Sequence, residues 1–124
     1  ISILVIDDNA DTLHLYDRYL ANTRYLFHGQ GDPLQAIALA RSLKPQVIVL
    51  DVMLPGVDGW ELLQRLRSEP ATSAIPIVVC SILPEQSLAE AMGAAAYLRK
   101  PVSREDFLAT LQRVLGSPAQ ESSA

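Results

Sequence analysis

Acidic, hydroxyl and basic side chains follow short apolar segments at several points of the 124-residue sequence. In chain order, the residues at these points are Asp7, Asp8, Asp51, Ser81 and Lys100. Three carboxylates that meet in one place repel one another, and a divalent cation between them is the simplest remedy. Ligands that are all oxygen atoms favour Mg²⁺ or Mn²⁺ over zinc. A lysine ammonium and a serine hydroxyl can hold the oxygens of a phosphoryl group, so these residue types predict metal-assisted phosphoryl transfer.

Two kinds of periodicity alternate along the chain and predict the elements that position these residues. Short apolar runs rich in β-branched residues predict buried parallel strands, and apolar residues at helical spacing predict helices between them. The predicted strands cover residues 3–6, 25–27, 47–50, 77–80 and 95–98. The predicted helices cover residues 11–21, 33–43, 60–67, 84–92 and a last segment capped by Ser103. Residues 29–32 are predicted to form a turn, in which Asp32 caps the second helix.

Strands that alternate with helices indicate an α/β fold with right-handed crossovers. We expect a five-stranded, parallel, doubly wound sheet of the flavodoxin-like (βα)5 type, with helices on both faces. Ligands of such sheets bind beyond the carboxyl ends of the strands. The residues that end the strands should therefore meet at one edge of the sheet and form the functional site.

The composition argues against several classes of protein. The chain carries 10 Lys and Arg against 14 Asp and Glu, a formal net charge of -4, and its basic residues are scattered. Direct nucleic-acid binding is not expected, because it needs a concentrated basic surface. The apolar runs are far shorter than the ~20 residues that cross a bilayer, so no membrane span is expected. The single cysteine, Cys80, is expected to be a buried apolar residue, and its isolation fits a reducing, cytoplasmic environment.

Four motifs contain the candidate residues and follow one another along the chain. They are residues 5–9 (VIDDN), 49–59 (VLDVMLPGVDG), 75–81 (IPIVVCS) and 97–101 (YLRKP). Through these motifs the sequence resembles the receiver domain of two-component response regulators. The resemblance implies a receiver domain at residues 1–116, followed by a flexible tail or linker stub at residues 117–124. An output or kinase domain in the same parent chain would fit such a linker.

The resemblance implies a phosphorylation-dependent signalling switch rather than an enzyme. Asp51 would accept a phosphoryl group from the phosphohistidine of a sensor histidine kinase or a histidine phosphotransfer protein, as one step of a phosphorelay. The domain would catalyse only its own phosphorylation and slow dephosphorylation. Asp8, Asp51 and the backbone carbonyl of Met53 would bind Mg²⁺, and Asp7 would act largely through a metal-bound water.

Four further residues receive roles or geometry from the same resemblance. Ser81 would be the switch hydroxyl, and Tyr97 would be the aromatic side chain that moves with it. Lys100 would hold the phosphoryl group, and the peptide bond before Pro101 would be cis. Receivers usually have a small residue after the switch hydroxyl, and Ile82 stands there in this chain. The segment between Ser81 and Tyr97 is also shorter than usual by roughly one helical turn.

Other functions use some of the same residues and stay open at this point. A Mg²⁺-dependent aspartyl phosphatase would share the carboxylates and the lysine, but Met53 occupies the place of its second acid. A nucleotide- or flavin-binding domain would need a glycine-rich loop after the first strand, and residues 7–10 contain no glycine. A constitutive pseudo-receiver that only binds partners would not need the acids, the hydroxyl and the lysine together. Asp58 is expected to support a turn or cap the third helix, and Asp7 and Asp8 are alternatively caps of the first helix.

Overall fold

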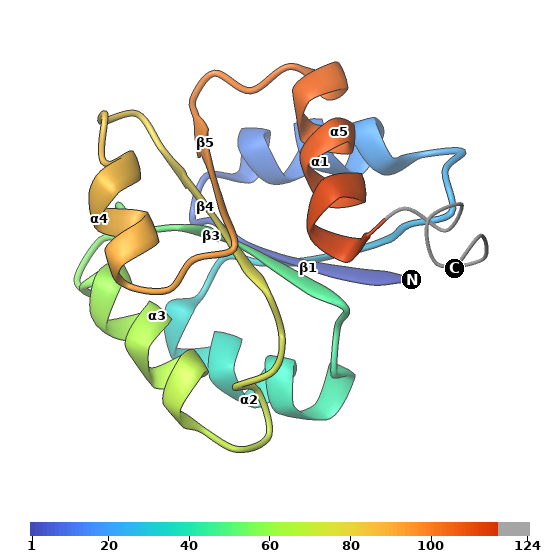
Figure 1. Ribbon diagram of the computed structural model, residues 1–124. Helices are drawn as coiled ribbons and strands as arrows, with labels where there is room; N and C mark the ends of the chain where they lie inside the picture. Colours follow the sequence, from blue (N-terminus) through green and yellow to red (C-terminus); the bar gives the residue numbers. More distant parts are fainter. Residues whose placement is uncertain (117–124) are drawn as a thin grey trace.

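Five parallel strands form the central sheet of the computed structural model, which describes residues 1–116 (Figure 1). The strands are β1 (Ser2–Ile6), β2 (Leu26–Gln30), β3 (Val47–Asp51), β4 (Ile77–Ser81) and β5 (Ala96–Arg99). Their order across the sheet is β2-β1-β3-β4-β5, and every neighbouring pair is parallel. The strand order reverses at β1, and ligands of such sheets bind at this point, here the carboxyl ends of β1 and β3. The predicted tail or linker stub at residues 117–124 lies outside the described residues.

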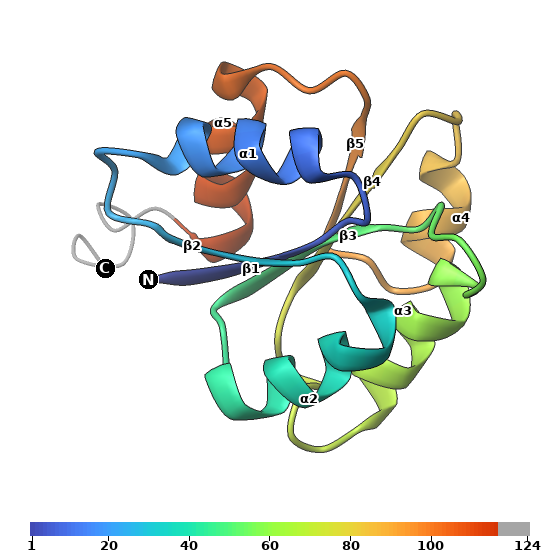
Figure 2. The same ribbon diagram turned by 180° about the vertical axis from the view of Figure 1, so that it is seen from behind.

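Five helices within residues 1–116 cover the two faces of the sheet. They are α1 (Ala10–Leu20), α2 (Pro33–Leu43), α3 (Gly59–Ser68), α4 (Gln86–Ala91) and α5 (Arg104–Leu115). Helices α1 and α5 lie on one face, and α2, α3 and α4 lie on the other, as Figure 1 and Figure 2 show from opposite sides. These layers and the strand order confirm the predicted doubly wound, flavodoxin-like fold. No helix in the described part of the chain is long and apolar enough to span a bilayer.

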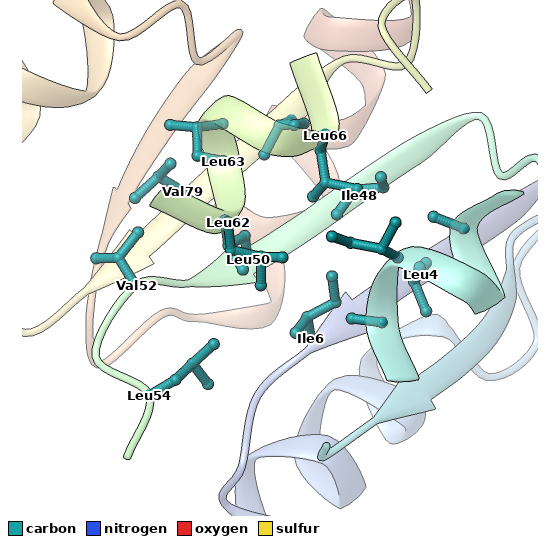
Figure 3. Packing of buried hydrophobic residues seen from close by; sticks show 14 of the residues in the cluster. Leu4, Ile6, Ile48, Leu50, Val52, Leu54, Leu62, Leu63, Leu66 and Val79 are labelled. Atoms are coloured by element: carbon teal, nitrogen blue, oxygen red, sulfur yellow. The ribbon is translucent and has the colours of Figure 1, made fainter. Parts of the chain in front are cut away.

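Side chains of the central strands alternate between two cores, and this alternation fixes the register of the sheet. Leu4 and Ile6 of β1 belong to the core beneath α2 and α3, which Figure 3 shows. Their neighbours Ile3 and Val5 belong to the core beneath α1 and α5. All four side chains are at most 1% exposed. A shift of β1 by one residue would exchange the two sets of contacts, so packing fixes the position of Asp7, the next residue.

Side-chain caps set where four of the helices begin. The capping residues, each of which accepts a hydrogen bond from a backbone N–H of the first turn, are Asn9, Asp32, Asp58 and Ser103. The last three confirm predictions from the sequence. Asn9 caps α1, so the alternative interpretation of Asp7 and Asp8 as caps of this helix is wrong. The two acids are therefore not needed to begin the helix.

Strand β2 extends beyond its predicted end. The sequence predicts a turn from Gly29 onward, whereas the strand continues to Gln30. Gly29 and Gln30 lie opposite Val5 and Ile6 of β1 in the parallel register. The turn prediction fails because pairing with β1 uses the backbone and does not depend on the side chains at these positions.

Helix α4 is shorter than its predicted range of residues 84–92. Glu85, just before the helix, has a non-helical backbone with φ -111° and ψ 30°. Gly93, just after it, has a φ of 88°, which is incompatible with a continuing helix. The short segment between Ser81 and Tyr97 therefore leaves room for a helix of only 6 residues.

Gly59, the first residue of α3, lies against the backbone of Val52, which directly follows Asp51. A Cβ atom at position 59 would overlap the Cα, carbonyl carbon and carbonyl oxygen of Val52. Neither segment can move freely, because one begins a helix and the other leaves a buried strand. The glycine therefore permits the close approach that supports the end of β3.

We expect Gly59→Ala to lower the free energy of unfolding by about 3 kcal/mol, because the added methyl group overlaps the Val52 backbone. Gly56→Ala is the matched control, because Gly56 has a φ of 72° but no atom within 4 Å of an added Cβ. Its backbone strain should cost only about 1 kcal/mol. Urea denaturation followed by circular dichroism measures both losses, and equal losses would contradict the close-approach argument.

Candidate functional site

The carboxyl ends of β1 and β3 bring three acidic side chains together. Asp51 is the last residue of β3, and Asp7 and Asp8 directly follow β1. Each of the three carboxylates has an oxygen within 4.8 Å of the others. Asp7 and Asp51 are buried, with 2% and 7% of their surfaces exposed, whereas Asp8 is exposed. The three acids thus meet at one edge of the sheet, as their positions after strands predict.

Lys100, which follows β5, lies between the two buried carboxylates. Its Nζ is 2.8 Å from Oδ2 of Asp7 and 3.2 Å from Oδ2 of Asp51. The backbone N–H of Lys100 donates to the carbonyl of Ser81 at 2.9 Å, which fixes the lysine beside the end of β4. The predicted cis peptide between Lys100 and Pro101 is confirmed. One ammonium therefore contacts two of the three carboxylates, and the cluster keeps an excess of negative charge.

Backbone N–H groups hold the other oxygen of each buried carboxylate. Oδ1 of Asp7 accepts a hydrogen bond from the N–H of Asn9 at 2.9 Å. Oδ1 of Asp51 accepts one from the N–H of Met53, also at 2.9 Å. Each carboxylate is thus held at both oxygens, as a buried charge requires. This double restraint fixes the direction in which the Asp51 carboxylate points.

Burial and charge act in opposite directions on the ionisation of the cluster. Burial raises the pKa of the Asp7 carboxyl above its ordinary value, although the hydrogen bond and the charge of Lys100 oppose the rise. Burial alone would lower the pKa of Lys100, but its hydrogen bonds to Asp7 and Asp51 and its attraction to both raise that pKa overall. The lysine therefore stays charged, and the buried Asp7 carboxyl is harder to ionise than a carboxyl in water.

Ser81, at the end of β4, is linked to Tyr97 of β5 through the backbone of Leu83. The Oγ of Ser81 accepts a hydrogen bond from the N–H of Leu83 at 3.1 Å. The hydroxyl of Tyr97 donates to the carbonyl oxygen of Leu83 and accepts a hydrogen bond from the N–H of Glu85 at 3.2 Å. A movement of the Ser81 hydroxyl would therefore act on a residue that Tyr97 also holds.

Arg99 makes a contact to the same loop that the sequence does not reveal. Its Nε donates to the carbonyl of Ile82 at 2.9 Å. Residues 82–85 form no helix or strand, so side chains of β5 hold this loop in place. An exposed arginine next to a lysine has the pattern of an ordinary solvated charge. No sequence signal distinguishes this arginine, because its partner is a backbone carbonyl.

Three exposed apolar side chains lie within two residues of Asp51 or Ser81 in the sequence. Met53, Ile82 and Leu83 are 46%, 56% and 42% exposed. Ile82 also lines a cavity of about 280 Å³ beside Lys100, whose other walls come from α1 and residues 101–102. None of these three side chains can donate or accept a strong hydrogen bond. These three exposed positions therefore offer no side-chain group that could hold a water in place.

The donor set fits Mg²⁺. The cluster that residues 1–116 form at this edge consists of carboxylates alone, and its negative charge exceeds the charge of the one lysine. Magnesium prefers oxygen ligands and keeps several of its waters. Two carboxylates that the hydrated ion can reach from solvent are therefore enough to bind it. Asp8 is exposed and can meet the ion from solvent, and the buried Asp51 is a fixed ligand.

Family comparison agrees with this geometry. The family model described as the response regulator receiver domain matches residues 3–112, a range that contains all of the acids, Ser81, Tyr97 and Lys100. The chain belongs to the response regulator receiver family. Receiver domains are generally signalling switches rather than classical enzymes. The match favours a receiver domain over the alternative of a nucleotide- or flavin-binding domain.

Relatives of this receiver domain include proteins of similar length. Protein PilH of Pseudomonas aeruginosa is 29% identical over 116 residues, which cover 91% of this chain and 96% of PilH. The solved structure of the chemotaxis protein CheY4 of Vibrio cholerae has a TM-score of 0.84 and 30% identity, over 92% of this chain and 98% of that chain.

A third relative provides a comparison for the metal site. The solved receiver domain of the sensor histidine kinase PA1611 of Pseudomonas aeruginosa has a magnesium ion in its active-site cleft. It has a TM-score of 0.83 and 26% identity, over 94% of this chain and 98% of that chain. Other relatives are longer, and this receiver domain spans 48% and 51% of two curated transcriptional regulators.

We expect Asp7→Asn to stabilise the metal-free receiver domain by about 1 kcal/mol at about pH 7. The folded protein binds the Asp7 proton more tightly than the unfolded chain does, because the folded pKa is raised. Stability is therefore lost as the pH rises from the ordinary carboxyl value of 3.8 through the folded pKa. Asn cannot ionise, so its stabilising effect should grow across that interval.

Urea denaturation of both proteins in chelator, between about pH 4 and pH 7, measures this difference. Asp17→Asn is the control, because it removes the same charge from an exposed position of α1 and should change stability by less than about 0.5 kcal/mol. A loss of stability in Asp7→Asn at neutral pH would show that the Lys100 contact outweighs the effect of burial.

Proposed function

We propose that this receiver domain is a phosphorylation-dependent switch whose phosphoacceptor is Asp51. The observation that carries the proposal is the double restraint of this carboxylate, with Oδ1 on the N–H of Met53 and Oδ2 3.2 Å from Nζ of Lys100. A carboxylate held in this way is a positioned nucleophile, and the adjacent ammonium can stabilise the negative charge of a transferring group. The proposed donor is the phosphohistidine of a sensor histidine kinase or a histidine phosphotransfer protein.

In the proposed transfer, a carboxylate oxygen of Asp51 bonds to phosphorus while the P–N bond of the donor breaks. The electron pair of the P–N bond returns to the donor imidazole, which takes up a proton from solvent. The ammonium of Lys100 exchanges its contact with Oδ2 of Asp51 for a contact with a negatively charged oxygen of the phosphoryl group. The Ser81 hydroxyl donates to another phosphoryl oxygen. These contacts supply the positioning and electrostatic stabilisation on which phosphoryl transfer mainly depends.

Mg²⁺ is the proposed cofactor, and Mn²⁺ should substitute for it. Asp8, Asp51 and the backbone carbonyl of Met53 are the proposed direct ligands, with Asp7 acting through a water. When bound, the ion neutralises part of the charge on the phosphoryl oxygens. The fit of the carboxylate cluster supports this assignment, as does the magnesium ion in the related receiver of PA1611.

The proposed switch runs from Ser81 to Tyr97. A phosphoryl group on Asp51 would attract the Ser81 hydroxyl, which now accepts from the N–H of Leu83. Because Tyr97 bonds to the carbonyl of Leu83, the change would reach β5 and the start of α4. Different contacts in the two states, rather than proximity alone, would shift the equilibrium between them.

The proposed partners and location follow from this role. A kinase or phosphotransfer protein would approach Asp51 across the apolar side chains of Met53, Ile82 and Leu83. An output or kinase domain in the same parent chain is the proposed recipient of the signal. We propose a cytoplasmic location, which suits the reduced thiol of Cys80. Burial raises the pKa of that thiol to about 12. Direct contact with nucleic acid or membrane is not part of this proposal.

We expect Asp51 to take up one phosphoryl group from acetyl phosphate, and only with Mg²⁺ or Mn²⁺, because the carboxylate cluster needs a cation beside the incoming negative charge. Intact-mass spectrometry measures the uptake. Asp51→Asn is the matched control, because it keeps the shape of the side chain and removes the nucleophilic carboxylate. Uptake that persists in Asp51→Asn, or that proceeds fully in chelator, would exclude this assignment.

The same assay separates the roles of the two acids that follow β1. Asp8→Ala should weaken Mg²⁺ binding more than Asp7→Ala does, because Asp8 is a proposed direct ligand and Asp7 acts through a water. A titration of the rate of uptake against Mg²⁺ concentration measures both. The reverse order would show that the two acids have exchanged roles.

We expect the phosphorylated form to persist for minutes or longer, because Met53 and Leu83, two residues after Asp51 and Ser81, are apolar and cannot orient an attacking water. Leu83→Gln should shorten the lifetime of the phosphorylated form by at least about threefold, since it replaces an apolar side chain with one that can hydrogen-bond to water. Leu34→Gln is the control, with the same change on an exposed leucine of α2. The decay of the phosphorylated mass after removal of the donor measures the lifetime, and decay within seconds in the unmodified domain would refute the prediction.

A further inference from the structure

The loop between β5 and α5 carries Lys100, and few hydrogen bonds hold its backbone. Residues 100–103 form no helix or strand. At one end, the backbone N–H of Lys100 donates to the carbonyl of Ser81, and at the other end Ser103 caps α5. Within the described chain, one hydrogen bond reaches the loop between these two ends, and it comes from Tyr19 of α1. Its hydroxyl donates to the carbonyl oxygen of Val102 at 2.8 Å.

Aromatic packing between α1 and α5 holds Tyr19 in place. Tyr16 and Phe107 stack with their ring centroids 4.6 Å apart, and the ring of Tyr19 lies 5.8 Å from each of them. Both supporting rings are buried, at 2% and 0% exposed. Nε of Arg104 also donates to the carbonyl of Tyr19 at 3.2 Å. Two helices therefore fix the direction of the Tyr19 hydroxyl.

We propose that Tyr19 is a positioning residue for Lys100 and acts through the Val102 carbonyl, a role that rests on the proposed function of Asp51. Nζ of Lys100 has to reach Asp7 and Asp51 at the same time, so the backbone from which it extends must be well placed. Val102 is two residues further along the chain and only 6% exposed. The Val102 side chain packs in the core beneath α1 and α5, and the bond to Tyr19 fixes the direction of the Val102 carbonyl, in the middle of the loop.

A role in packing alone makes a different prediction for the same substitution. Tyr19→Phe keeps the ring contacts with Tyr16 and Phe107 and removes only the hydroxyl. If the ring alone matters, Lys100 is unaffected. If the hydroxyl positions the loop, the Lys100 ammonium becomes more mobile while the cores on both faces of the sheet stay intact.

The first measurement is the NMR order parameter of the Lys100 side-chain ammonium in the metal-free full chain. Tyr19→Phe should lower it. Tyr25→Phe is the matched control and should leave it unchanged, because the Tyr25 hydroxyl accepts a hydrogen bond from Arg24 just before β2, at the amino end of that strand and away from the site. This measurement does not depend on phosphorylation. An unchanged order parameter in Tyr19→Phe would overturn the proposal.

The second measurement compares the affinities for Mg²⁺ and for beryllofluoride, which stands in for the phosphoryl group. Tyr19→Phe should weaken beryllofluoride binding by about fivefold, the effect of one lost hydrogen bond, and leave Mg²⁺ affinity unchanged. In a Lys100→Gln background, Tyr19→Phe should weaken binding by less than about twofold, because the group that it positions is gone.

These two measurements keep failure of the positioning role distinct from failure of the proposed function. Equal losses of Mg²⁺ and beryllofluoride affinity, or a full fivefold loss in the Lys100→Gln background, would indicate a general structural effect and overturn the positioning role. If the unmodified domain binds no beryllofluoride while ammonium mobility still responds to Tyr19→Phe, the proposed function of Asp51 fails and the positioning role stands.

Discussion

One lysine ammonium shared by two buried carboxylates is the interaction on which this structure depends. Asp7, Asp51 and Lys100 come from the ends of three different strands, and the lysine is 93 and 49 residues away from its two partners along the chain. Only a completed parallel sheet brings such distant residues together. Asp8 adds a third carboxylate, so the cluster keeps a negative charge that the lysine does not balance. This imbalance favours a divalent cation and, with it, an anionic group.

The rest of the fold holds this cluster in a state that is unfavourable by itself. β1 and β3 are buried on both faces, so their apolar cores offset the desolvation of Asp7 and Asp51. Gly59 lets α3 approach the residue that follows Asp51, and the hydroxyl of Tyr19 fixes the loop that follows Lys100. A site that destabilises its own protein is common where a charged group must be ready to react. Burial of the Asp7 carboxylate, which raises the pKa of its carboxyl, opposes stability near neutral pH.

The sequence predicts the parts of this structure that have a periodic or positional signal. Apolar runs that end in Asp7 and Asp51 predict buried strands, and the topology of such sheets then predicts that the acids meet. The end of β2 is wrong in the prediction, because Gly29 and Gln30 pair through their backbones. The contacts of Arg99 and Tyr19 could not be predicted, since each donates to a backbone carbonyl that only the folded chain brings within reach. The roles of Ser81 and Tyr97 came from resemblance to receivers, and they stay predictions.

The central claim is that a cation and a phosphoryl group bind together at Asp51 and that the effect travels through Leu83 to Tyr97. Two-dimensional NMR of the full chain, with Mg²⁺ and beryllofluoride added separately and together, tests it most directly. The account predicts that beryllofluoride changes the signals of Leu83, Tyr97 and Lys100 only when Mg²⁺ is present. Changes of the same size without Mg²⁺, or a bound complex that leaves Leu83 and Lys100 unaffected, would contradict it.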